Sequence, residues 1–139
     1  MASALLPAAA FGDTASSVEL YVASDGDFLA FKPDQLTCPA GAHVKLTFHH
    51  AGHRIQQKHD WVLLKPGTAD AFMKAVLEAG EAHNWMPPDD PRVLVATPQI
   101  DPGESVTIEF TAPPPGDYPF VCTYTGHGDV MRGVLHVTG

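Results

Sequence analysis

The chain has 139 residues, with 16 acidic and 8 basic side chains that give it a formal net charge of −8 at pH 7. This length suits one domain with a sizeable buried core. The acidic excess argues against nucleic-acid binding, which depends on lysine and arginine to neutralise phosphates. No apolar run approaches the roughly 20 residues that a membrane-spanning helix needs.

Residues 1–16 are rich in alanine and contain no lysine or arginine; the first basic residue is Lys32. A secretory signal normally begins with a positively charged region, and this one is missing. We expect residues 1–16 to be a flexible tail, either the remnant of a signal segment or a membrane tether. The folded domain is then expected to span residues 17–139.

Short apolar runs separated by proline- and glycine-containing turns predict a β-architecture. Apolar and polar residues alternate with the period of a half-buried strand in residues 18–22, 44–48, 106–110 and 118–122. A short apolar segment follows at residues 28–31. Further strands are expected near residues 59–64, 93–96 and 133–138, and the strand at residues 93–96 is expected to be buried. About seven to eight strands at this spacing indicate an all-β sandwich.

One helix is predicted between these strands, over about residues 69–79. Its apolar residues recur at helical spacing: Phe72, Met73, Val76 and Leu77. Thr68 stands at the N-cap position and Gly80 where a helix commonly ends. We expect Met73 to be a core residue rather than a metal ligand.

A short segment near the C-terminus carries the strongest chemical pattern. Cys122, His127 and Met131 follow the spacing Cys-x4-His-x3-Met. Two histidines and a cysteine with a weak axial methionine form the ligand set of blue electron-transfer copper, so one further histidine is needed. The alternative is a Cys38–Cys122 disulfide, but we expect Cys38 to be a small buried apolar residue.

Six histidines are candidates for the missing ligand: His43, His49, His50, His53, His59 and His83. A metal-binding imidazole must be held in a fixed orientation. His59 opens an apolar strand and meets that condition best. The segment that contains His49, His50 and His53 is polar, and surface positions are expected for all three. His43 is expected to face solvent, and His83 enters a proline-rich loop.

The sequence resembles the azurin and auracyanin branch of the cupredoxins over roughly residues 18–139. The matching stretches are His59-Asp60-Trp61-Val62-Leu63, Pro88-Asp89-Asp90-Pro91-Arg92-Val93, Cys122-Thr123-Tyr124-Thr125-Gly126-His127 and Met131-Arg132-Gly133. The resemblance implies a Greek-key β-sandwich with one inserted helix and one type 1 copper ion. His59, Cys122 and His127 would be the equatorial ligands, Met131 the axial one, and the backbone carbonyl of Lys58 a weak fifth contact.

The same resemblance places three further residues around the metal: Asp60, Thr123 and Tyr124. Asp60 stands where the family usually has asparagine. Its charge is expected to favour Cu(II) and lower the reduction potential, while Asp60 accepts a hydrogen bond from Thr123. Thr125 replaces a proline that is common in this loop and adds a backbone N–H near the cysteine, which would act on the potential in the opposite direction.

The resemblance predicts a monomer that carries single electrons and has no enzymatic activity. It would be periplasmic or otherwise extracytoplasmic, and on one interpretation tethered to a membrane. Partners would be redox proteins, either cytochromes or copper or haem oxidoreductases, docking near His127. An acidic stretch from Glu78 to Asp90 is expected to be a solvated surface or to orient such partners by charge. The alternatives are a copper-binding or delivery protein without a redox role, and an enzyme with an open copper position.

Overall fold

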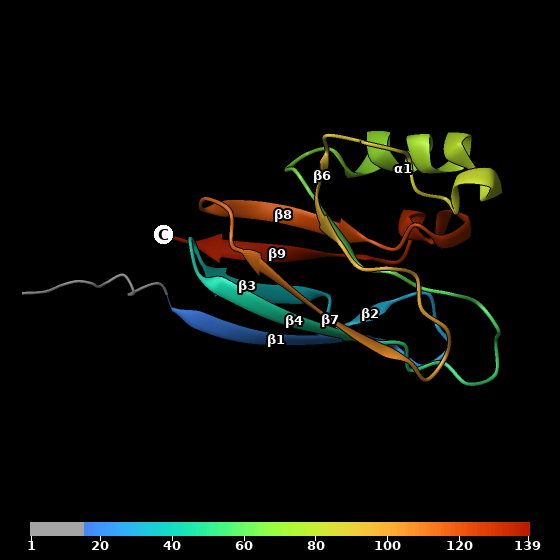
Figure 1. The fold of residues 1–139 in the computed structure, drawn as a ribbon, viewed down its shortest axis with the longest axis horizontal. Helices are drawn as coiled ribbons and strands as arrows, with labels where there is room; N and C mark the ends of the chain where they lie inside the picture. Colours follow the sequence, from blue (N-terminus) through green and yellow to red (C-terminus); the bar gives the residue numbers. More distant parts are fainter. Residues whose placement is uncertain (1–15) are drawn as a thin grey trace, which may run out of the picture.

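The protein is a sandwich of two mixed β-sheets in a computed structural model that describes residues 16–139 (Figure 1). In order across the first sheet, the strands are β2 (Phe31–Lys32), β1 (Ser17–Ser24), β4 (His43–His49) and β7 (Ser105–Thr111). In the second they are β3 (Gln35–Pro39), β9 (Arg132–Thr138), β8 (Gly116–Val121), β5 (Val62–Leu64) and β6 (Val93–Ala96). The arrangement agrees with the predicted Greek-key sandwich; predictions for residues 1–15 fall outside the described residues.

The core lies between the two sheets because each strand directs alternate side chains inward. In β4, Val44, Leu46 and Phe48 are fully buried, while their neighbours in the strand face outward. From the second sheet, Phe120 packs against Trp61 and Phe31 with ring centroids 5.2 Å apart in both pairs. The inward-facing residues predicted for β8 are therefore confirmed.

The single α-helix in the described residues, α1 (Ala69–Ala79), covers the outer face of the second sheet. Its buried residues pack against outward-facing residues of β5 and β8, which gives the sheet apolar residues on both faces. The helix occupies the predicted residues, and Met73 is a core residue with 2% exposure. Gly80 ends the helix with φ of +63° and donates its N–H to the carbonyl of Val76.

Three details of this region differ from what the sequence suggested. Thr68 occupies the predicted N-cap position, but its side chain does not cap the helix, because its hydroxyl donates to the carbonyl of Lys65 at 2.7 Å. Leu77 is 52% exposed, because it lies where the helix passes the edge of the ligand loop rather than the sheet. The strand β6 is only partly buried, with Leu94 40% exposed, since it forms the edge of its sheet.

Both cysteines are buried thiols, so the expected absence of a disulfide between Cys38 and Cys122 agrees with the structure. Within residues 16–139, no helix combines the length and apolar character needed to cross a membrane.

Candidate metal centre

The sequence predicted that His59 opens a strand, and this is wrong: backbone hydrogen bonds hold His59, but it lies before the strand β5. Its N–H and C=O groups exchange hydrogen bonds with Ile100 at 3.1 and 2.9 Å, which forms an isolated bridge. Two residues later, Trp61 exchanges hydrogen bonds with Thr97. The strand β5 begins only at Val62. Hydrogen bonds to the neighbouring segment, residues 97–100, therefore hold the His59 backbone and so fix the direction of its imidazole.

The other three predicted ligands lie in one closed loop between β8 and β9. Cys122 follows β8 directly and donates its backbone N–H to the carbonyl of Met131 at 3.1 Å. Met131 in turn donates its N–H to the carbonyl of His127 at 2.7 Å. The backbone therefore links the three ligand positions in a ring. We call residues 122–131 the ligand loop.

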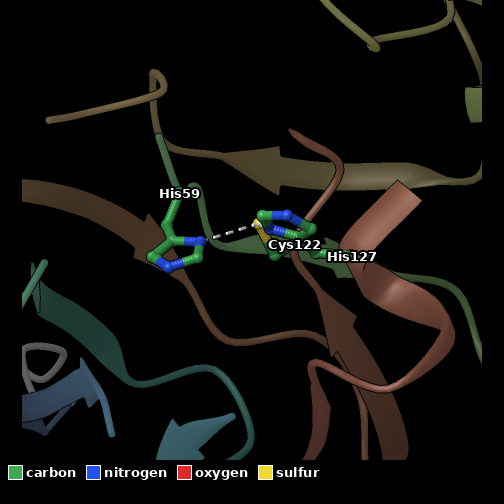
Figure 2. A group of neighbouring side chains, drawn as sticks. All are labelled: His59, Cys122 and His127. Atoms are coloured by element: carbon green, nitrogen blue, oxygen red, sulfur yellow. Dashed lines mark hydrogen bonds between the residues drawn. The ribbon is translucent and has the colours of Figure 1, made fainter. Parts of the chain in front are cut away.

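Side chains of His59, Cys122 and His127 converge in the interior (Figure 2). The Sγ atom of Cys122 lies 3.6 Å from Nδ1 of His59 and 3.8 Å from Nδ1 of His127. A metal ion about 2.0 Å from nitrogen and about 2.3 Å from sulfur, with ligands at trigonal angles, would separate such atoms by about 3.8 Å. The spacing fits one metal ion with these three ligands.

Burial at this centre favours uncharged ligands. His59 is 2% exposed, and burial together with the neighbouring imidazoles lowers its pKa to about 3. Burial likewise lowers the pKa of His127, so both imidazoles are neutral and ready to bind a metal. Burial raises the pKa of the Cys122 thiol, and the carboxylate of Asp60 raises it further. Metal binding must therefore displace the thiol proton.

The site contains the expected methionine and two donors to the cysteine. Met131 is fully buried and belongs to the same core cluster as Cys122. Backbone N–H groups of Asp60 and Tyr124 act on the cysteine and favour its thiolate form. These two groups oppose the rise in the Cys122 pKa that burial causes. A contribution from the Thr125 N–H stays a prediction.

Asp60 joins the two ligand-bearing segments as the sequence predicted. One carboxylate oxygen accepts the backbone N–H of Thr123 at 2.7 Å, and the other accepts the Thr123 hydroxyl at 2.6 Å. Asp60 is 1% exposed, and burial raises its pKa, although both hydrogen bonds oppose that rise. The Thr123 hydroxyl also lies 3.4 Å from Nε2 of Gln99, a donor that no sequence pattern had pointed to.

The predicted surface position of His50 is wrong. It is 1% exposed rather than at the surface, and its ring lies 4.3 Å from that of His59, centroid to centroid. Its Nε2 donates to the carbonyl of Gln57 at 2.6 Å, while its Nδ1 accepts the N–H of Gly52 at 3.1 Å. The alternation in β4 continues inward from Phe48 to His50, a pattern that would have predicted this burial.

The backbone shape of the ligand loop restricts which residues can stand at positions 125 and 128. Thr125 has φ of +49°, a conformation that a proline, whose φ is fixed at about −65°, cannot adopt. Gly128 passes so close to α1 that an added Cβ would overlap Met73 and lie 2.7 Å from the carbonyl oxygen of Cys122. The helix therefore packs directly on the loop and restricts its movement.

The remaining histidine candidates lie outside the centre. His43 bonds Glu109 at 2.6 Å and His49 bonds Ser105 at 2.7 Å, both on the outer face of the first sheet. His53 and His83 are exposed. The side chain of Lys58 donates to Asp101 at 2.8 Å, so it is directed toward a neighbouring loop. A role for the Lys58 carbonyl stays a prediction.

Comparison with known proteins agrees with this centre. Residues 1–137 match the family described as the cupredoxin-like domain, and the chain belongs to this family. It is 37% identical over 122 residues to auracyanin-A of Chloroflexus aurantiacus, covering 86% of this chain and 74% of that protein. It is 34% identical over 145 residues to an azurin of Methylobacillus flagellatus, covering 97% of both proteins.

Solved structures show the same likeness in three dimensions. Dithionite-reduced auracyanin from Roseiflexus castenholzii superposes with a TM-score of 0.79 at 36% identity, covering 89% of this chain and 99% of that one. Auracyanin A of Chloroflexus aurantiacus, described as a "blue" copper protein, also gives a TM-score of 0.79 at 36% identity, covering 88% and 100%. The centre formed by His59, Cys122, His127 and Met131 therefore lies in a cupredoxin fold.

Proposed function

We propose that this protein is a type 1 copper protein that carries single electrons between redox proteins. The observation that carries this proposal is the buried convergence of His59, Cys122 and His127, whose ligand atoms all lie within 4.8 Å of one another. Two imidazoles, a thiolate and a weakly bound thioether suit an ion that must be stable as both Cu(I) and Cu(II). Copper would supply the one-electron change, and the four side chains would hold the ion.

Rigidity of the ligands supports a carrier rather than an enzyme. Electron transfer is fastest when the ligands do not rearrange, and both ligand segments are fixed by backbone hydrogen bonds. Ile100 holds the His59 backbone, and the carbonyls of Met131 and His127 close the ligand loop. Asp60 then ties one segment to the other through Thr123. Full burial of Cys122 and Met131 further supports a site closed to small molecules.

Electrons would enter and leave through His127. This ring is 6% exposed, more than the other ligands, so its edge is the part of the centre nearest to solvent. Tyr124 stands against it edge-on, with ring centroids 5.6 Å apart. A partner that docks over the ligand loop would place its own redox group close to this edge. The proposal includes a location outside the cytoplasm, as the likeness to azurins and auracyanins implies.

Visible and paramagnetic-resonance spectra of the copper-loaded protein test the proposal. A strong thiolate-to-Cu(II) band that reductant bleaches reversibly is expected, and Cys122→Ser should abolish it while Cys38→Ser leaves it in place. Loss of the band in the Cys38 variant alone would show that the ligand is misassigned. A colourless protein that holds only Cu(I) would instead indicate copper delivery. A spectrum that changes on adding azide would indicate an open site and an enzyme.

A further inference from the structure

Acidic side chains are concentrated at one end of the molecule. Five loops gather at the end where the ligand loop lies: residues 25–30, 50–58, 80–85, 98–104 and 123–130 (Figure 1). We call them the metal-end loops. Hydrogen bonds connect several of them, including those from the His53 N–H to Asp27, from the Gly103 N–H to the His50 carbonyl, and from Gln99 to the Asn84 carbonyl.

The charge of these loops differs from that of the remaining described surface. They contain six acidic residues, Asp25, Asp27, Glu81, Asp101, Glu104 and Asp129, and two basic ones, Arg54 and Lys58. Outside them, and apart from the buried Asp60, the described residues include eight acidic and six basic side chains. Lys58 is also paired with Asp101 at 2.8 Å. Most of the excess negative charge therefore lies around the metal centre.

Two of these carboxylates stand directly beside the ligand loop. Glu81 lines a groove of about 410 Å³ together with Tyr124 and Thr125. Asp129 is exposed within the ligand loop, two residues after His127. Among the described residues neither carboxylate forms an ion pair, so both are free to act on an approaching charge.

The same loops also carry much of the exposed apolar surface. Phe28, Ile55 and Val130 are 73%, 48% and 65% exposed, although each is a large apolar residue. Protein interfaces commonly combine an apolar centre with a polar rim. The charged residues that share these loops with the exposed apolar side chains are mostly acidic, which specifies the charge of the surface that would fit against them.

We propose that the metal-end loops are a docking surface for a basic redox protein, one that presents lysine and arginine around an apolar contact area. This inference rests on the proposed function and names the partner's chemistry. In the complex, copper held by His59, Cys122, His127 and Met131 would give one electron to the partner's redox group, which is reduced as Cu(I) becomes Cu(II), or would take one from it in the reverse direction. No bond or proton is exchanged.

The charge distribution predicts how association should respond to salt. Opposite charges at the two contact surfaces accelerate encounter by steering, and the acceleration falls as ions screen it. Exposed charges are largely screened beyond about 8 Å at physiological ionic strength. An asymmetric distribution also orients the partner toward the metal end, whereas an evenly spread charge would attract it to every face.

Stopped-flow kinetics with the full, copper-loaded chain test this inference. The probes are a basic and an acidic c-type cytochrome, each at low and high ionic strength. One variant combines Glu81→Lys with Asp129→Lys. A matched control combines Glu19→Lys with Asp117→Lys, two exposed positions away from the ligand loop that give the same change of net charge.

The metal-end variant should react with the basic cytochrome about tenfold more slowly than the natural protein at low salt, and the control should change less than twofold. Three results would overturn the inference: an equal loss of rate in both variants, a rate with the basic cytochrome that does not depend on salt, or a natural protein that reacts faster with the acidic cytochrome than with the basic one. Electron exchange with a small uncharged reagent separates the two proposals. If that exchange fails, the proposed function fails; if it proceeds while the cytochrome shows no charge dependence, only the docking inference fails.

Discussion

Replacement of Asp60 by asparagine should raise the reduction potential of the bound copper. The carboxylate is 1% exposed and is held by two hydrogen bonds, both from Thr123. Its negative charge stabilises Cu(II) more than Cu(I). At an effective dielectric constant near 20 and an assumed separation of about 7 Å, one charge contributes about 2.4 kcal/mol, or roughly 100 mV for one electron. The expected change is an increase of that order.

Spectroelectrochemistry at pH 7 measures the change, with Asp101→Asn as the control. Asp101 belongs to the same metal-end loops, but its side chain is 58% exposed. Water screens such a charge, so its removal should shift the potential by less than about 20 mV. The asparagine at position 60 keeps an acceptor for the Thr123 N–H, and the fold should persist. A potential that does not move would refute the reasoning, because it would mean that Asp60 is uncharged in the holoprotein; a potential that falls would contradict its sign.

Three further outcomes are expected. Gly128→Ala should destabilise the protein by about 1–3 kcal/mol in chemical denaturation and shift the copper spectrum, because the added methyl group overlaps Met73; an unchanged spectrum would contradict this. His59→Ala should abolish the type 1 spectrum whereas His83→Ala should not, and the opposite result would overturn the ligand assignment. For the metal-free protein, the lowered pKa values of His59 and His127 make the unfolded state bind more protons below pH 6.5. Stability measured by urea titration should therefore fall from pH 6.5 toward pH 4, by at most about 1.4 kcal/mol per pH unit for each histidine. The raised pKa of Asp60 acts in the opposite direction, and a stability that rises over this range would contradict the expectation.

Local periodicity predicted most of the fold. Strand alternation identified β1, β4, β7 and β8, and helical spacing placed α1 at the residues where it lies. Contacts between distant segments were not predictable in this way. One local detail was not predicted either: the Thr68 hydroxyl donates to the carbonyl of Lys65, in the turn before the helix, instead of capping the helix.

Three of the four ligands could be named from the sequence, because their donor types stand at fixed spacing in one loop. His59 had to be chosen among six histidines, from its apolar neighbours and from the family resemblance. The surroundings of the site could be named only in part. Asp60 and Thr123 follow ligands directly and were expected to interact. His50 and Gln99 reach the site from separate loops. The His50 ring lies against the His59 ring at a tilt of 33°, and the Gln99 amide donates a hydrogen bond to Thr123. No local pattern encodes which distant loop will fold against the metal centre.

The backbone closure of the ligand loop has a consequence for how the protein acquires its metal. Cys122, His127 and Met131 are joined within ten residues, and hydrogen bonds between the first and last of them need no other part of the chain. His59 arrives from a segment more than sixty residues earlier in the sequence. If copper arrives before folding is complete, the ligand loop by itself would offer three of the four ligands. A bound metal ion would then link this loop to the His59 segment.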